Sequence, residues 1–138
     1  MTNPITGNLD YMNISLTIMS RVKELIDGLH FAYTNLESNS PDVAYVINHK
    51  DEMIDQLLQY RDQIASGHEI VDSIKLCLEN EDVRNKFFTK DVSKDDLLDL
   101  LDSNTDLVNS TIEAFNTSIE LLNDLNLVDK DQLIIEKI

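Results

Sequence analysis

The chain has 138 residues, of which 42% are hydrophobic and 6% aromatic, with three Gly, two Pro and no Trp. Such a length makes one domain, which can bury about 68% of its unfolded surface without disulfides or metals. Sheet proteins need many turns, and turns use Gly and Pro, so this composition favours helices. We therefore expect an all-α fold, an antiparallel helical bundle of three to four long amphipathic helices with coiled-coil-like seams.

The net charge of the chain restricts the class of partner that it can bind. The 26 Asp and Glu outnumber the 11 Lys and Arg, which gives a formal net charge of −15. Nucleic acid and anionic lipid are themselves negative, so we expect no direct nucleic-acid partner and no membrane partner. The most acidic third is 91–138, with 12 acidic and 3 basic side chains. It has two interpretations, a solvated face that keeps the protein soluble and a docking surface for a basic partner.

The sequence carries no recognisable targeting segment. No run approaches about 18 apolar residues, and the N-terminus lacks the basic and apolar regions of a secretory signal. We therefore expect a cytoplasmic protein, or part of a virion if the protein is viral. Cys77 is the one cysteine, so no intrachain disulfide can form, and its apolar neighbours indicate a small buried side chain.

The first predicted helix follows an irregular arm. Residues 1–9 contain Pro4 and Gly7 and predict no regular structure. A helix is expected over 10–37, because apolar residues recur there at steps of three and four. They are Met19, Val22, Ile26, Leu29, Tyr33 and Leu36. Gly28 lies inside this helix and is a candidate for the close approach of another helix.

A second helix is predicted to begin after Ser40, a good N-cap, because Pro41 suits the first helical position. Its apolar seam keeps a seven-residue spacing through Leu57, Ile64, Val71 and Leu78. One long central helix over 41–88 explains this unbroken phase. The alternative ends a helix at Gly67, as a C-terminal cap, and gives a compact four-helix bundle.

A further helix is predicted after a break at 89–92. The spacing of Ser93 and Asp96 resembles a capping box at its start. The helix should run to about 126, with a pause at 103–106, four residues that favour caps and turns. Its heptad seam consists of Val108, Ile112, Phe115, Ile119 and Leu122.

The C-terminal segment is apolar. Asp129 can cap a last short helix that carries Leu133, Ile134, Ile135 and Ile138. This apolar tail either packs on the core of its own chain or forms a handle for a partner or a sister subunit, and Leu133, Ile134 and Ile138 are the candidate contact residues. The expected division is an irregular arm (1–9), a helical bundle domain (10–126) and a short tail or helix (127–138).

No constellation of residues predicts catalysis, a cofactor or a metal site. The three histidines lack a Cys or His partner at zinc spacing. A calcium-loop pattern begins at Asp91 but fails at Asp96 and Asp102, where Gly and Glu are required. Three glycines leave little material for active-site loops. We therefore expect a protein that is not an enzyme and uses no cofactor.

One basic stripe stands out in this acidic chain. Arg61, His68 and Lys75 lie seven apart, beside the apolar seam of the predicted central helix. Long basic side chains can lay their stems over such a seam and meet the carboxylates of their own chain. Alternatively, the stripe contacts another chain and sets its register.

Together these patterns predict a helical interaction protein, a structural or scaffolding subunit of a multiprotein complex. We expect protein partners, as a homo- or hetero-oligomer formed through helix faces. The chain is rich in Asn, Ile and Asp, which suits an AT-rich genome, so a viral or phage assembly component is one form of this function. The alternative is an acidic inhibitor that imitates nucleic acid towards a DNA-binding protein.

Overall fold

The computed structural model describes residues 11–88 and 93–138, and all regular structure in these ranges is helical. The elements are a π-helical turn η1 (Ile14–Ile18) and helices α2 (Met19–Thr34), α3 (Pro41–Asn48), α4 (Lys50–Ala65), α5 (Gly67–Glu79), α6 (Glu81–Phe87), α7 (Lys94–Asp124) and α8 (Lys130–Leu133). The all-α fold is confirmed, although several helices are shorter than a bundle of three to four long helices requires. The expected arm at 1–9 and break at 89–92 lie outside the described residues.

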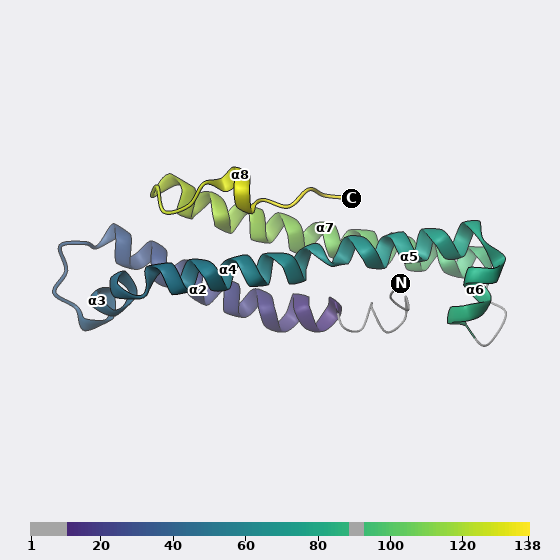
Figure 1. The fold of residues 1–138 in the computed structure, drawn as a ribbon, viewed down its shortest axis with the longest axis horizontal. Coiled ribbons are helices and arrows are strands. Elements are labelled where there is room, and N and C mark those ends of the chain that lie inside the picture. The colour runs from purple at the N-terminus through teal and green to yellow at the C-terminus, as the bar shows by residue number, and fades with distance from the viewer. Residues whose placement is uncertain (1–10, 89–92) are drawn as a thin grey trace.

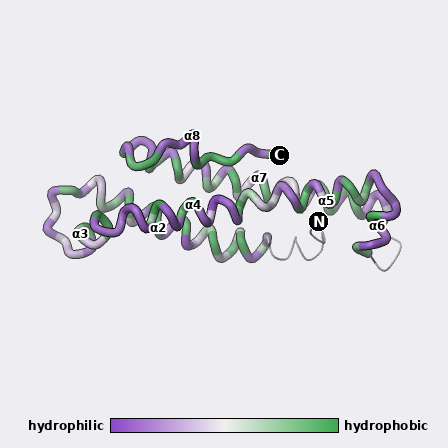
Figure 2. The backbone as a smooth tube through the Cα atoms, in the orientation of Figure 1, coloured by the Kyte–Doolittle hydropathy of each residue, from purple (hydrophilic) through white to green (hydrophobic). Residues whose placement is uncertain are grey.

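The long elements lie side by side. Figure 1 shows an elongated molecule in which α2, the consecutive helices α4 and α5, and α7 run along one another. Hydrophobic residues recur turn by turn along these helices (Figure 2), as expected of elements that bury one face. All five members of the apolar pattern predicted on α7 are fully buried. It consists of Val108, Ile112, Phe115, Ile119 and Leu122.

The first helix is shorter than the predicted 10–37. α2 stops at Thr34, and Asn35 leaves the helix with φ −125° and ψ 39°. Leu36, expected on the seam, therefore lies beyond the helix and is exposed. Gly28 does not mark a tight approach, because a Cβ there would meet only the Met53 Cε, at an ordinary 3.8 Å.

The predicted continuous helix over 41–88 is wrong at two places. His49 has φ −110°, and its ring Nδ1 lies 2.8 Å from the carbonyl oxygen of Tyr45. Asn80 is extended, and its side-chain oxygen accepts the N–H of Asp82 at 3.0 Å, which caps α6. Local bonds between side chain and backbone therefore end helices that the apolar periodicity alone would continue.

Between those two breaks, α4 and α5 continue nearly in line (Figure 1), so the predicted break with a C-terminal cap at Gly67 is also wrong. Ser66 interrupts them as a single residue, and its backbone stays helical with φ −60° and ψ −16°. Gly67 has no positive φ, which such a cap would require. The unbroken apolar phase was therefore a correct indication of a continuous path through this point.

Gly67 is where three elements approach closely. A Cβ at this position would lie 2.8 Å from Tyr11 Cε2 and 2.8 Å from both methyl carbons of Val108 on α7. The Tyr11 hydroxyl donates to the carbonyl oxygen of Ile64 at 2.9 Å, just before the interruption at the end of α4. A buried carbonyl at such an interruption needs a partner. The missing side chain at Gly67 makes room for Tyr11, which is fully buried.

α7 begins as predicted, with the Ser93 hydroxyl accepting the N–H of Asp96 at 3.1 Å, but the pause expected at 103–106 is wrong. Asn104 is buried within the continuous helix, and its amide nitrogen donates to the carbonyl oxygen of Leu100 at 2.7 Å. Its side chain therefore bonds back along the helix and does not cap a new one. The Asn104 Oδ1 is buried without a hydrogen-bond partner in the described ranges.

A tight turn reverses the chain after α7. Asn126 takes the left-handed conformation with φ 59° and donates its N–H to the carbonyl oxygen of Asn123 at 2.9 Å. Leu127 donates to the carbonyl oxygen of Leu122 at 3.0 Å, so the turn is a Schellman motif with Asn in the place of Gly. Asp129 then caps α8, as predicted. The chain beyond α8 returns along the bundle (Figure 1).

Candidate protein-interaction site

Two sets of predicted site residues meet at the C-terminal segment. From α4, Arg61 Nε donates to the carbonyl oxygen of Leu133 at 3.0 Å, and Arg61 Nη2 donates to that of Ile134 at 3.5 Å. From α5, His68 Nε2 lies 2.6 Å from the carbonyl oxygen of Glu136. A carbonyl can only accept, so this bond places a proton on Nε2. The basic stripe and the apolar tail, which the sequence presented separately, are parts of one contact.

The third member of the stripe does not take part. Lys75 is exposed on α5 and makes no hydrogen bond or ion pair with the described part of the chain. Of the three stripe residues, Arg61 and His68 contact the C-terminal segment of their own chain, and Lys75 is exposed.

Two asparagines of α7 hold the same segment from its other side. Asn116 Nδ2 donates to the carbonyl oxygen of Ile135 at 2.8 Å, and Asn116 Oδ1 accepts the N–H of Ile135 at 2.9 Å. Asn109 does the same for Ile138, at 3.4 Å and 2.8 Å. Sequence reasoning missed both asparagines. The available signal was their spacing of seven on a helix whose apolar seam has the same repeat.

Helix and tail geometry explain this pairing. Seven residues of an α-helix advance about 10.5 Å. Three residues of a polyproline II strand advance about 9 Å and complete one turn, so every third residue faces the same way. Ile134 has the polyproline II conformation, with φ −64° and ψ 149°. Residues 135 and 138 can therefore present their backbones to Asn116 and Asn109 in turn.

The groove is the seam between the α4 and α5 helices on one side and α7 on the other, with residues 133–138 lying in it. Leu133 and Ile135 are buried there, with 3% and 6% of their surfaces exposed. Ile134 and Ile138 remain 38% and 37% exposed. The tail thus packs on its own chain through Leu133 and Ile135, which is the first of its two interpretations.

One ion pair joins the C-terminal segment to α7. Lys137 Nζ lies 3.1 Å from Glu113 Oε2, between the two clamping asparagines of α7. Both side chains are largely exposed, and such a pair stabilises by less than about 1 kcal/mol. The segment 129–138 carries three acidic and two basic residues, net −1, which leaves −14 on residues 1–128. The groove therefore belongs to a strongly acidic body but holds a segment that is itself slightly acidic.

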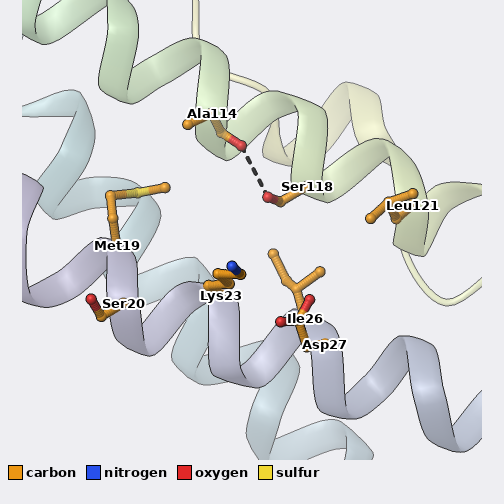
Figure 3. A pocket seen from close by; sticks show the side chains of 8 residues that line it. All are labelled: Met19, Ser20, Lys23, Ile26, Asp27, Ala114, Ser118 and Leu121. Atoms are coloured by element: carbon orange, nitrogen blue, oxygen red, sulfur yellow. Dashed lines mark hydrogen bonds between the residues drawn. The ribbon is translucent and has the colours of Figure 1, made fainter.

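A cleft of about 460 Å³ between α2 and α7 is a second candidate surface (Figure 3). Its lining residues are Met19, Ser20, Lys23, Ile26, Asp27, Ala114, Ser118 and Leu121. The Ser118 hydroxyl donates to the carbonyl oxygen of Ala114 at 3.0 Å, so it is engaged by its own helix. Lys23 and Asp27 are exposed, and the described lining brings no set of polar groups together as a catalytic site requires.

A smaller apolar cavity, about 250 Å³, lies between η1 and the first half of α7. Met12, Leu16, Leu100 and Leu107 supply most of its lining, with Asn104 beside them. Leu16 is 72% exposed there, the most exposed large apolar side chain among the described residues. This is an apolar helix face of the kind that another helix covers.

The remaining candidates for a functional feature are the Cys77 thiol, a metal site and a membrane-spanning helix. Burial raises the pKa of the Cys77 thiol, with nearby Arg84 partly opposing it, and a raised pKa disfavours the reactive thiolate. Within 11–88 and 93–138, no three His, Cys, Asp or Glu side chains are placed to hold a metal ion. The calcium-loop pattern that starts at Asp91 begins outside the described residues. None of the described helices is both long enough and apolar enough to cross a membrane.

Comparisons with protein-family models, with curated proteins and with solved structures found no match to this chain. The geometry of the groove is therefore the basis for the functional proposal.

Proposed function

We propose that this protein is a non-enzymatic interaction protein that holds another protein chain, as a scaffolding or assembly subunit of a complex. The observation that carries the proposal is the groove between the α4 and α5 helices and α7. Four of its side chains bond to the backbone of an extended segment, two from each side. They are Arg61, His68, Asn109 and Asn116.

Backbone recognition supports an interaction role. Hydrogen bonds to peptide N–H and C=O groups hold a segment of any sequence that adopts the right conformation, and buried side chains then provide specificity. In this groove the buried anchors are Leu133 and Ile135. The same arrangement can hold a segment supplied by another chain, because the α7–α8 turn adds no atom to the bonds in the groove.

The test uses the full-length chain with the substitution Ile135→Asp. A carboxylate cannot occupy the apolar anchor site without a large desolvation penalty, so the tail leaves the groove. A fluorescent peptide of residues 129–138 should then bind, as measured by anisotropy. Adding Arg61→Ala should weaken binding by about tenfold or more, because a hydrogen bond from a charged donor is lost. Lys75→Ala is the matched control and should leave the affinity unchanged.

Circular dichroism at 222 nm checks that the Ile135→Asp chain keeps its helices. If it unfolds, the wild-type chain serves as the second test, with the side-chain amide signals of Asn109 and Asn116 followed by NMR. The tethered tail has an effective concentration near the millimolar range, so millimolar peptide is needed to compete. Absence of binding in the folded variant, or of any shift in the wild-type chain, would contradict the proposal.

Oligomer formation through helix faces is the second part of the proposal. The exposed Leu16 and the apolar cavity beside it support contact with another helix. Light scattering on a sizing column, at two salt concentrations, measures the solution mass. We expect a mass above 15.8 kDa that falls with Leu16→Asp. A monomer at both salt concentrations would remove this face from the proposal.

One observation favours the second candidate function, an acidic mimic of nucleic acid. Exposed carboxylates follow one side of α7 at steps of three, four and seven residues. They belong to Asp95, Asp99, Asp102, Asp106, Glu113, Glu120 and Asp124. A mimic should bind a cationic nuclease with an affinity that falls steeply as salt rises. Affinity that barely changes with salt would exclude this function.

A further inference from the structure

We infer that the natural occupant of the groove is a basic, polyproline II-like segment of another protein. In the structure the chain's own tail occupies the position of this segment. The inference rests on the proposed function and adds the conformation, register and charge of the partner. It follows from three features of the groove, which are its three-residue register, its pattern of used and unused backbone groups, and its charge.

The register fixes the conformation. Asn116 and Asn109 each make a two-bond contact with one residue, and the two contacted residues are three apart, Ile135 and Ile138. In a flat β-strand successive residues face opposite sides, so two residues three apart point in opposite directions and cannot both face the same helix. A polyproline II segment can, because it repeats every three residues. The partner segment must therefore take this conformation, antiparallel to α7.

The pattern of backbone bonds fixes where the partner needs an N–H group. The N–H groups of Ile135 and Ile138 donate to the asparagine side chains of α7. The backbone N–H groups of Glu136 and Lys137 make no hydrogen bond with the described residues. The groove therefore requires an N–H at the positions of 135 and 138 but not at those of 136 and 137. It also requires apolar side chains at the positions of Leu133 and Ile135, which are buried.

Charge favours a basic partner over the chain's own tail. Glu113 lies beside Lys137, so a basic residue suits this position of the groove. Gln132 and Glu136 are exposed and neither is basic, whereas residues 1–128 carry a net charge of −14. A segment with lysines at these two positions keeps the same backbone bonds and gains long-range attraction. The chain's own tail therefore gains less electrostatic attraction in the groove than a basic segment from another chain.

Peptides test each requirement on the folded full-length Ile135→Asp chain. The reference peptide is residues 129–138, net −1. The basic peptide carries Gln132→Lys and Glu136→Lys, and the acidic control carries Gln132→Glu. Both altered positions are exposed, so the three peptides should differ in charge alone. At low salt we expect the basic peptide to bind about tenfold more tightly than the reference, with the difference shrinking as salt rises.

N-methylation of single peptide bonds tests the register without changing any side chain. Methylation at the position of Ile135 or Ile138 removes an N–H that the asparagines accept and should weaken binding by about tenfold. Methylation at Glu136 is the matched control and should change the affinity by less than about twofold.

The outcomes separate this inference from the proposed function. If the reference peptide binds but the basic peptide gains nothing, or if methylation at 136 costs as much as methylation at 135, the inference is wrong and the groove still binds peptides. A wild-type dimer that forms with rising concentration and is abolished by Ile135→Asp would also overturn it, because the occupant would then be the tail of a second copy. If no peptide binds, the proposed function falls with it.

Discussion

The junction at Gly67 and the tail groove both lie where α4 and α5 run along α7, but they are held together by different forces. At the junction, Tyr11 and Val108 fill the space that Gly67 leaves, and both side chains are fully buried. In the groove, the side chains of Asn109 and Asn116 bind a backbone segment that is partly exposed. The junction depends on close packing, whereas the groove depends on directed hydrogen bonds.

The difference shows which contact can be exchanged. Close packing between three elements leaves no room for an added atom, so a small change there lowers the stability of the fold. A segment held by its own backbone can leave and be replaced while the helices beneath keep their core. We therefore expect substitutions at the junction to change stability, and we propose that the groove serves binding.

The largest effect is expected from Gly67→Ala. The added Cβ would lie 2.8 Å from Tyr11 and Val108, so this change should lower the free energy of unfolding by about 2 kcal/mol, although Ala is the better helix former. Gly28→Ala is the control, because its Cβ would have space, and it should raise stability by about 0.5 kcal/mol. Urea unfolding measures both. Equal effects of the two substitutions would argue against a tight junction.

Alkaline pH tests the junction through Tyr11. Burial raises the pKa of Tyr11 to about 12 from 10.0, with Thr111 partly opposing the shift. The folded state therefore keeps a proton that the unfolded chain loses above pH 10, so the contribution of Tyr11 to stability is constant below that pH and falls between about pH 10 and 12. The loss should reach about 2 kcal/mol. Tyr11→Phe should remove this part of the pH dependence, and an unchanged profile would place the cause elsewhere.

A smaller, local effect is expected in the groove. Asn116→Ala leaves the N–H and carbonyl of Ile135 without their partners, which should open the tail at a cost of about 1–2 kcal/mol. Limited proteolysis should then cut after Lys130 or Lys137 sooner than in the wild-type chain. Thr117→Ala, at an exposed neighbouring position of α7, is the control. Equal cleavage rates of the two variants would show that the asparagine does not hold the tail.

The last substitution should increase the free energy of unfolding. Asn104→Leu replaces a buried side chain whose Oδ1 has no partner in the described structure, on the buried side of α7. Removing an unsatisfied polar atom should raise the free energy of unfolding by about 1 kcal/mol. Thermal unfolding checks this. A loss of stability would mean that the Oδ1 has a role that the described contacts do not show.

Local signals in the sequence predicted the fold better than they predicted the groove. The seam of α7 and the caps at Ser40, Ser93 and Asp129 depend on neighbouring residues, so spacing and residue type were sufficient to find them. The helix breaks at His49 and Asn80 were missed because a side chain bonded to the nearby backbone against the apolar periodicity.

The groove could be predicted only in part. Arg61 and Leu133 were each selected, one as basic and one as apolar, but their contact joins residues 72 positions apart. No local pattern sets such a pairing, because it depends on where the turn after α7 directs the chain. Asn109 and Asn116 were overlooked, since asparagine on the polar side of a helix is usually solvated and their spacing acquires meaning only beside a polyproline II segment.

Backbone hydrogen exchange, followed by NMR in the wild-type chain, tests the central claim most directly. The account predicts that the N–H groups of Ile135 and Ile138 exchange at least about tenfold more slowly than in the free peptide 129–138, yet well before the core amides of α7. Asn116→Ala and Asn109→Ala should each remove the protection at their own partner. Exchange at the free-peptide rate would contradict a bound tail, and exchange as slow as the α7 core would contradict a tail that can be replaced.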